Sequence, residues 1–131
     1  MRVSVVTPIH NERENIPELH KELTAALSTF KNDYEIIVVD DGSTDGTETI
    51  VRGYRDYGVV LLALPRVGKA AALNAAAARA TGTILVFSDA NSLYAPGALR
   101  ALVRPFADPE VGGAAGNQVY LRSSGGKVPP G

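Results

Sequence analysis

Short runs of apolar residues alternate along this chain with segments of helical periodicity, and this alternation limits the folds open to it. Three runs, Val3–Thr7, Tyr34–Val39 and Thr83–Phe87, are largely apolar at consecutive positions rather than at every second one. Strands of this kind are covered on both faces, which is typical of a parallel sheet between two layers of helices. A fourth run, Val59–Leu64, is also predicted as a strand.

Four segments between and after these runs are predicted as helices. Ile16–Phe30 carries apolar residues at spacings of three and four, and Ala70–Ala80 is rich in alanine, the strongest helix former. Asp45–Tyr57 contains two glycines, and Pro96–Phe106 begins with a proline suited to a first turn. With a further strand predicted over Val111–Val119, the order is βαβαβαβαβ. It predicts an α/β fold, a Rossmann-like and mostly parallel sheet flanked by helices on both faces.

The composition excludes several classes of protein. The chain of 131 residues fits one domain, and its net charge of −1 gives no electrostatic reason to expect nucleic acid as a partner. It has no cysteine for disulfides or thiolate metal sites, and no apolar stretch approaches the roughly 20 residues that span a bilayer. We expect a cytoplasmic protein, at the inner face of the membrane in a longer parent. Residues 1–122 are expected to form the domain, and residues 123–131 a flexible tail.

Polar side chains gather where the predicted strands end. Residues 7–12, 40–45, 65–69 and 88–91 follow the four strands and supply carboxylates, amides, hydroxyls and two cations. Ligands of parallel α/β sheets bind beyond the carboxyl ends of the strands. We therefore predict the functional site at this edge, with His10 in its wall.

Asp40 and Asp41 are the strongest element of this edge. Adjacent carboxylates repel each other unless a positive charge or hydrogen-bond donors stabilise them. One of the two can accept hydrogen bonds from a base or a ribose hydroxyl. The alternative is local: Ser43 or Thr44 caps the following helix, and an aspartate stabilises its first turn. We predict that Asp41 binds the ligand and that Asp40 has a partly structural role.

The segment Asp89-Ala90-Asn91 can aim two oxygen-bearing side chains at one point. Carboxylate and amide oxygens are hard ligands suited to magnesium or manganese holding a diphosphate. The alternative is a plain turn, because aspartate and asparagine favour turns.

Gly68-Lys69 opens the alanine-rich segment, where backbone amides and the helix dipole favour a phosphate. The alternative for Lys69 is a solvated surface charge. The segment is not a Walker A loop, since Ala63 and Ala70 stand where that motif needs glycine and Ser or Thr. A dinucleotide-binding G-x-G-x-x-G is also missing after the first strand.

Four motifs, in this order and at these strand ends, resemble family 2 of the inverting glycosyltransferases, which have the GT-A fold. The segments that carry the resemblance are Val3–Glu12, Glu35–Thr47, Gly68–Asn74 with Ala80–Gly82, and Phe87–Asn91 followed by Pro96 and Leu99. Each motif is short, so the specificity comes from the set of four. The resemblance covers nearly the whole chain up to about Gln118.

The resemblance implies a nucleotide site and a metal site. The implied nucleotide-binding residues are Thr7, Pro8, Asn11, Glu12, Asp40, Asp41, Lys69, Asn74 and Asp89, and the implied metal ligands are Asp89 and Asn91. Asp41 would bind the base, usually uracil, and Lys69 would lie near the base and the phosphates on a loop supported by Asn74. Asp89 would face the ribose or the metal, and Asn91 would bind the divalent Mg or Mn that bridges the diphosphate.

The implied reaction is transfer of a sugar, with inversion, from a nucleotide-diphosphate sugar to a hydroxyl of a sugar, lipid or protein acceptor. A UDP-sugar is the usual donor in this family, and polysaccharide or cell-envelope synthesis is the implied setting. The family's acidic catalytic base lies well downstream, so we expect it beyond residue 131 and name no catalytic residue here. We expect the isolated chain to bind nucleotide with little or no transferase activity.

Two departures from the family pattern keep alternatives open. Asn91 stands where aspartate is usual, which lowers the charge at the metal, and Val67 and Ala76 stand where glycine is common. One alternative is a non-catalytic nucleotide-binding fragment or partner module. The other is a nucleotidyltransferase, which would carry a glycine- and arginine-rich phosphate loop where residues 10–13 read His-Asn-Glu-Arg.

Overall fold

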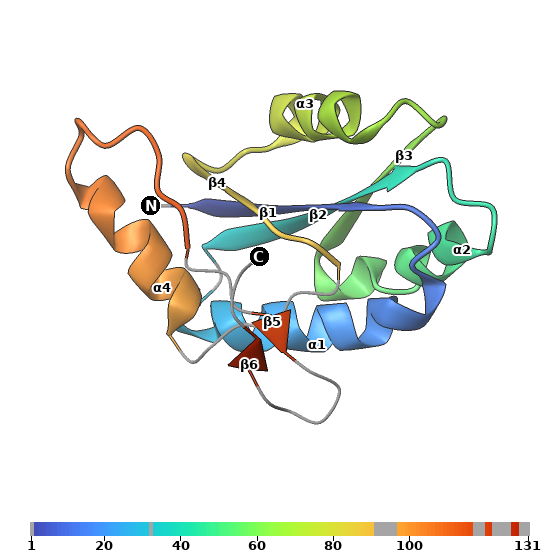
Figure 1. Ribbon diagram of the computed structural model, residues 1–131, viewed down its shortest axis with the longest axis horizontal. Coiled ribbons are helices and arrows are strands. Elements are labelled where there is room, and N and C mark those ends of the chain that lie inside the picture. Colours follow the sequence, from blue (N-terminus) through green and yellow to red (C-terminus); the bar gives the residue numbers. More distant parts are fainter. Residues whose placement is uncertain (1, 32, 91–96, 117–119, 122–126, 129–131) are drawn as a thin grey trace.

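A four-stranded parallel sheet forms the centre of the computed structural model, which describes residues 2–31, 33–90, 97–116, 120–121 and 127–128 (Figure 1). Its strand order is β3-β2-β1-β4. The strands are β1 (Val3–Ile9), β2 (Tyr34–Asp41), β3 (Val59–Leu64) and β4 (Ile84–Phe87). All three pairings are parallel, so the predicted parallel sheet is confirmed.

Helices cover both faces of the sheet, as the sequence predicts for an α/β fold. The helix α3 (Lys69–Arg79) lies on one face, and α1 (Ile16–Leu27), α2 (Thr47–Arg52) and α4 (Ala98–Val103) lie on the other (Figure 1). Single turns of 3-10 helix precede or extend these helices, at Arg13–Asn15, Ser28–Phe30, Arg55–Tyr57 and Arg104–Ala107. Within the described residues, no helix has both the length and the apolar composition needed to span a bilayer.

Glycines explain two differences from the predicted elements. The helix predicted over 45–57 is interrupted after Arg52, at Gly53, and the chain then turns into β3 through Gly58 in the left-handed region with φ +84°. The strand predicted over 111–119 is wrong for residues 111–116, which form no regular structure. Glycine adds no packing side chain to a strand and weakens it, and three glycines fall in this segment. Residues 117–119 lie outside the described residues.

Beyond this segment, two short strands pair with each other. They are β5 (Tyr120–Leu121) and β6 (Lys127–Val128), and their pairing is antiparallel. Most of residues 123–131 lie outside the described residues, so the flexible tail stays a prediction, as does the domain boundary at residue 122.

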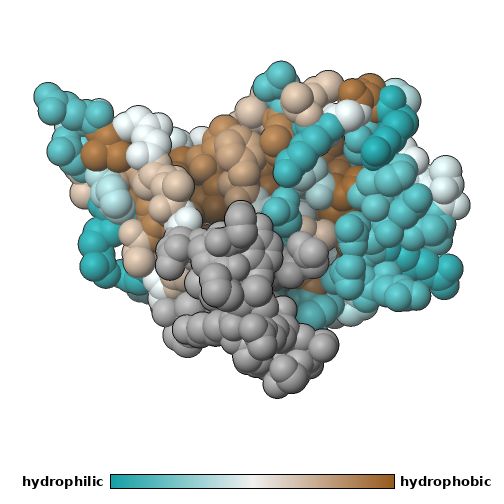
Figure 2. All heavy atoms as spheres, viewed as in Figure 1, coloured by the Kyte–Doolittle hydropathy of each residue, from teal (hydrophilic) through white to brown (hydrophobic). Residues whose placement is uncertain are grey.

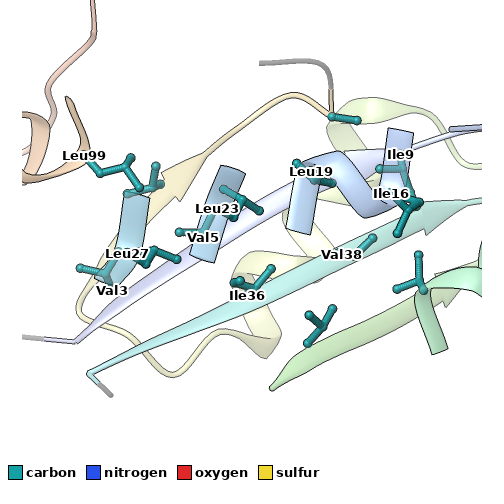
Figure 3. Packing of buried hydrophobic residues seen from close by; sticks show 14 of the residues in the cluster. Val3, Val5, Ile9, Ile16, Leu19, Leu23, Leu27, Ile36, Val38 and Leu99 are labelled. Carbon is teal, nitrogen blue, oxygen red and sulfur yellow. The ribbon is translucent and has the colours of Figure 1, made fainter. Parts of the chain in front are cut away.

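The continuous apolar strands supply two cores, one on each face of the sheet. Alternate residues of β1 and β2 point to opposite faces, and helices cover both, so apolar residues predominate on both faces of these strands. The larger core packs β-strand residues such as Val5 and Ile36 against Leu19 and Leu23 of α1 (Figure 3). The smaller core packs β1 and β2 against α3 through two buried alanines, and its members are Val6, Ile37, Val39, Ala72 and Ala76.

The strand β4 is less covered than β1 and β2. The helix α3 contacts β1 and β2, and Phe87, at the end of β4, is 56% exposed. Hydrophobic residues are visible on the surface between α3 and α4 (Figure 2).

A buried carboxylate joins the amino ends of the strands to the turn before β4. Glu35 is 8% exposed, and its Oε2 accepts hydrogen bonds from the Ser4 hydroxyl (2.6 Å), the Thr81 amide (2.6 Å) and the Thr81 hydroxyl (2.8 Å). The Gly82 amide donates in turn to Ser4 Oγ at 2.8 Å. Burial raises the pKa of Glu35, but these hydrogen bonds outweigh it and hold the pKa below its usual range.

We predict that Glu35→Gln lowers the free energy of unfolding at pH 7 by about 1–2 kcal/mol, because neutral acceptors make weaker hydrogen bonds than carboxylates. The folded-state pKa of Glu35 lies below the unfolded one. Its contribution is therefore fully present above about pH 5 and is lost as the pH falls through the folded-state pKa. Urea unfolding of both proteins from pH 7 to pH 3 measures this difference.

Glu48→Gln is the matched control, because Glu48 forms a surface ion pair with Arg52 whose side chains are 42% and 64% exposed. This substitution should lower the free energy of unfolding by less than about 0.5 kcal/mol. A difference between wild type and Glu35→Gln that does not shrink toward low pH would contradict the assigned role of the carboxylate.

Candidate nucleotide-binding site

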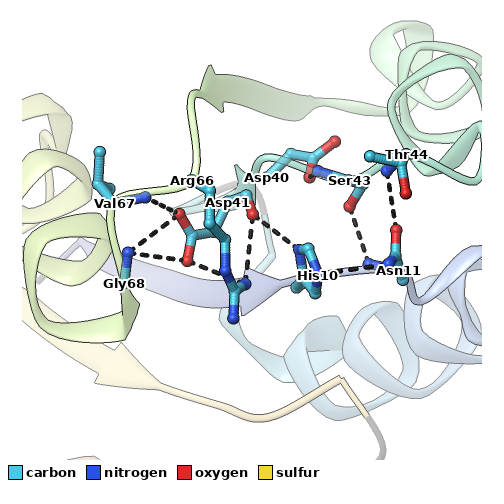
Figure 4. Close-up of polar contacts among 9 residues, drawn as sticks. All are labelled: His10, Asn11, Asp40, Asp41, Ser43, Thr44, Arg66, Val67 and Gly68. Atoms are coloured by element: carbon cyan, nitrogen blue, oxygen red, sulfur yellow. Dashed lines mark hydrogen bonds and ion pairs between the residues drawn. The ribbon is translucent and has the colours of Figure 1, made fainter.

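The carboxyl ends of the four strands lie at one edge of the sheet, and most of the residues predicted from the sequence meet there. The loops that follow β1, β2 and β3 are tied together by polar contacts (Figure 4). The strand order reverses between β1 and β4. Such a reversal opens a crevice outside the strand ends, where parallel α/β sheets bind their ligands.

The carboxylate of Asp41 binds the loop between β3 and α3. Its Oδ1 accepts hydrogen bonds from the amides of Val67 (2.7 Å) and Gly68 (3.3 Å). Its Oδ2 accepts from the Gly68 amide (3.1 Å) and from Arg66 Nη1 (3.2 Å). The Val67 amide, followed by the Gly68 amide and the Arg66 charge, holds the pKa of Asp41 below its usual range against the effect of burial. Asp41 therefore stays ionised and fixes the shape of this loop.

Gly42 makes this close approach possible. It has φ +70°, and a Cβ at this position would lie 2.7 Å from the backbone nitrogen of Arg66. The chain at Arg66 thus passes directly against Gly42, which leaves no room for a side chain. We call Asp41, Gly42 and residues 66–68 the loop clasp.

Asp40 points to a different partner. Its Oδ1 accepts a hydrogen bond from the Ser43 amide at 3.0 Å, and the residue is 3% exposed. Neighbouring residues of a strand point to opposite faces, so the two carboxylates are separated although they are adjacent in sequence. This contact confirms the partly structural role predicted for Asp40.

His10 and Asn11 connect the loop after β1 to the loop after β2. The side-chain oxygen Oδ1 of Asn11 accepts a hydrogen bond from the backbone amide of Thr44 (2.8 Å). The backbone amide of Asn11 donates to Ser43 Oγ (2.9 Å). The Asn11 Nδ2 therefore faces His10 Nε2 at 3.3 Å, and His10 Nδ1 lies 2.8 Å from the Asp41 carbonyl oxygen. Since a carbonyl only accepts, Nδ1 carries the proton and Nε2 accepts from Asn11. These bonds hold Asn11 in the left-handed region, at φ +52°.

The helix cap differs from the one predicted. Ser43 and Thr44 bind Asn11 instead of capping α2, so the predicted cap is wrong. Asp45 Oδ1 accepts from the amide (3.0 Å) and the hydroxyl of Thr47, the first residue of α2. The aspartate predicted to stabilise the first turn is thereby confirmed as Asp45.

Lys69 and Asp89 face each other across the edge. Lys69 is the first residue of α3, and Asp89 follows β4 by two positions. The distance between Lys69 Nζ and Asp89 Oδ1 is 3.6 Å, and the side chains are 69% and 51% exposed. The structure thus brings together the residues assigned to phosphate and to metal, whereas Asn91 lies outside the described residues.

The remaining predicted residues have varied surroundings. Pro8 is half-buried in β1, and Glu12 Oε2 accepts from Asn15 Nδ2 at 2.5 Å. The Asn74 side chain is exposed on α3, so its predicted support of the loop stays a prediction. Thr7 is fully buried, and its hydroxyl has no partner in the described part of the chain.

The donor set fits a divalent cation only in part. Among the described residues, no group of three or more histidine, cysteine, aspartate or glutamate side chains could hold a metal. Asp89 offers one accessible carboxylate that already faces a positive charge, the Lys69 ammonium. A cation held here would need ligands from outside the described residues, from Asn91 or from a bound diphosphate.

The sequence placed Arg66 at the functional edge without a role, and it gave no sign that the loop amides belong to the site. An amide ligand carries no side-chain signature, so the role of Val67 could not be found from its residue type. Gly42, placed between two acids and a serine, was the one available signal that the backbone is crowded there.

Comparisons with known proteins show the family and the fold of the chain. The model of the family described as "Glycosyl transferase family 2" matches residues 4–130. An undecaprenyl-phosphate 4-deoxy-4-formamido-L-arabinose transferase from Enterobacter sp. (strain 638) is 35% identical over 106 residues, which are 78% of this chain and 32% of that protein.

Two solved structures are similar in fold and sequence. The mannosyltransferase PcManGT from Pyrobaculum calidifontis, in complex with GDP-Man and Mn2+, has a TM-score of 0.74 and 38% identity over 85% of this chain and 34% of its own. S. aureus TarS 1-349 in complex with UDP-GlcNAc has a TM-score of 0.70 and 29% identity over 90% of this chain and 37% of its own. The chain therefore spans about a third of the length of these relatives.

We predict that Gly42→Ala opens the loop clasp. Alanine at φ +70° is strained, and its Cβ would displace the Arg66 backbone, so we expect a loss of about 2–4 kcal/mol in unfolding free energy. Hydrogen exchange at the Val67 and Gly68 amides should become faster. Gly46→Ala is the matched control, since Gly46 has φ +88° but nothing within 4 Å of a Cβ. It should lower the free energy of unfolding by about 1–2 kcal/mol, the cost of the left-handed backbone alone. Equal losses in the two variants would argue against the crowded contact.

We also predict that Thr7→Val raises the free energy of unfolding by about 1 kcal/mol, because it removes a buried hydroxyl without a partner at nearly constant shape. Thr47→Val is the comparison, since Thr47 is equally buried but its hydroxyl donates to Asp45, and it should be destabilising. Thermal and chemical unfolding measure both changes. A loss of stability in Thr7→Val would mean that its hydroxyl does have a partner.

Proposed function

Because the chain belongs to glycosyl transferase family 2, we propose that it binds the nucleoside diphosphate of a sugar donor at the carboxyl edge of its sheet. The loop clasp is the observation that carries this proposal. An ionised, almost fully buried aspartate at a strand end holds a loop that leads into a helix and its first-turn lysine. This arrangement offers a base acceptor and a phosphate cation within one continuous rim.

We assign the base to Asp41 and the phosphates to Lys69. The Asp41 carboxylate already accepts hydrogen bonds from Val67, Gly68 and Arg66, so an N–H group of a base would replace one of the longer contacts, to Arg66 or Gly68. Uracil is the base that the sequence resemblance implies. The two similar solved structures contain GDP-Man and UDP-GlcNAc, so both nucleotides belong in the test.

We assign the divalent cation to Asp89, together with Asn91. When bound, Mg2+ or Mn2+ would neutralise negative charge on the departing nucleoside diphosphate. The support for this assignment is the exposed Asp89 carboxylate and the Mn2+ in the complex of PcManGT.

The proposed reaction of the complete enzyme is inverting transfer of the sugar to an acceptor hydroxyl. Such a displacement needs a base that removes the acceptor proton, and we assign none of the described residues to this task. The chain corresponds to about a third of its relatives, so we propose that it forms the donor-binding part and that transfer needs further residues. The acceptor, a polysaccharide or cell-envelope setting and the cytoplasmic location remain predictions of the sequence.

Calorimetric titration with UDP and with GDP, each with and without Mn2+, tests the proposal. We expect metal-dependent binding of UDP, and a loss of about 10- to 100-fold in Asp41→Asn, because a charged acceptor is replaced by an amide. Glu48→Gln on α2 is the control and should bind as the wild type does. A folded chain that binds neither nucleotide would contradict the proposed function and favour a module without a nucleotide site.

A further inference from the structure

His20 lies half-buried on α1, within a cluster of three aromatic rings. The centre of its imidazole is 4.5 Å from that of the Tyr54 ring and 5.5 Å from that of the Tyr57 ring, and the two tyrosine rings are 6.1 Å apart. Both tyrosines belong to residues 53–58, which join α2 to β3 and which we call the tyrosine turn. The ring cluster therefore connects α1 to this turn.

The backbone of the tyrosine turn is bonded to its own residues and to its two ends. The Tyr57 amide donates to the Tyr54 carbonyl (3.0 Å), and the Gly58 amide donates to the Arg55 carbonyl (3.1 Å). Glycines bound the turn on both sides, and Gly58 has φ +84°. Within residues 53–58, all of which the structure describes, no backbone hydrogen bond reaches α1. The attachment of the turn to α1 thus depends on side chains, including the rings around His20.

The surroundings of His20 suit a neutral imidazole. Its Nε2 is shielded from water and has no hydrogen-bond partner in the described part of the chain. The crevice between α1, α2 and the sheet that contains His20 is lined mainly by apolar side chains, such as Leu23, Val51 and Val59. A charged imidazole donates from both nitrogens, so its Nε2–H would face a region without an acceptor.

No negative charge compensates for this among the described groups that face His20. The positions three and four residues away on α1, residues 16, 17, 23 and 24, are uncharged. The groups that face His20 from the tyrosine turn are the phenol rings, while Arg55 and Asp56 are exposed and do not line the crevice. Burial is the effect that shifts the pKa of His20, and it lowers it.

We propose that His20 is a pH switch, whose neutral imidazole holds the tyrosine turn against α1 and whose protonation releases the turn. A proton added to Nε2 places a charge and an unpaired donor in the crevice, so the charged ring moves toward water and gives up its contacts with the tyrosines. This inference does not depend on the proposed function.

The direction of the pH dependence follows from burial. The pKa of His20 is lower in the folded protein than in the released state, where the ordinary value is 6.5. The contact is therefore fully present above about pH 6.5, and it is lost as the pH falls through the folded-state pKa.

Amide hydrogen exchange followed by NMR tests this, with each rate divided by that of an unstructured peptide at the same pH. Between about pH 7.5 and pH 5.5, the protection of the Tyr57 and Gly58 amides should fall by about three- to tenfold, because a released histidine takes up its proton near pH 6.5. His20→Phe keeps a ring that does not titrate, so its protection should not change over this range. His10→Gln is the matched control, since His10 is the other histidine of the chain, and it should show the fall seen in the wild type.

A protection that does not change with pH in the wild type, an equal fall in His20→Phe, or no fall in His10→Gln would each overturn the inference. The wild type also decides the question if His20→Phe does not fold. The NMR signals of the His20 imidazole and of the Tyr57 ring should then shift with one common midpoint, below that of a free histidine. A Tyr57 signal that stays constant while His20 titrates would overturn the proposed switch.

Discussion

The hydrogen bonds from the amides of Val67 and Gly68 to the Asp41 carboxylate set the position of the loop that enters α3, and the rim depends on that loop. A charged acceptor makes strong bonds to amides when it is shielded from water, and Asp41 is 4% exposed. The same strand end receives His10 through the Asp41 carbonyl. Asp41 therefore holds the loops after β1, β2 and β3 in position relative to one another.

A second buried carboxylate on β2 holds the other end of α3. Glu35 binds Thr81, just beyond the helix, while Asp41 binds the loop just before it. The β2 segment from Glu35 to Asp41 spans about 20 Å and α3 about 16 Å, so the two acids are spaced to fasten both ends of the helix. This matters because α3 faces the sheet with short alanine side chains, which bury little apolar surface each. We infer that charge-assisted hydrogen bonds supply much of the anchoring that larger side chains supply for α1.

The predictions from sequence succeeded where the signal is local and periodic. The four strands of the sheet, the helices α1 and α3 and the parallel arrangement followed from apolar runs and helical spacing, since burial of one face imposes these periods. They failed at residues 111–116 and after Arg52, where glycines weaken regular structure without marking where it stops. The role of Ser43 and Thr44 was also mistaken, because the competing partner, Asn11, is distant in sequence and close in space.

The sequence by itself determined the fold class, the family and the edge of the sheet at which the polar residues gather, because these depend on residue types and their order along the chain. Only the tertiary structure decided the strand order, the amides that Asp40 and Asp41 bind, and the pairing of Lys69 with Asp89. The physical reason is that hydrogen bonds and ion pairs act over about 3–4 Å and need a fixed direction. A chain brings such partners together by folding, and neither spacing nor composition records which amide will face which carboxylate.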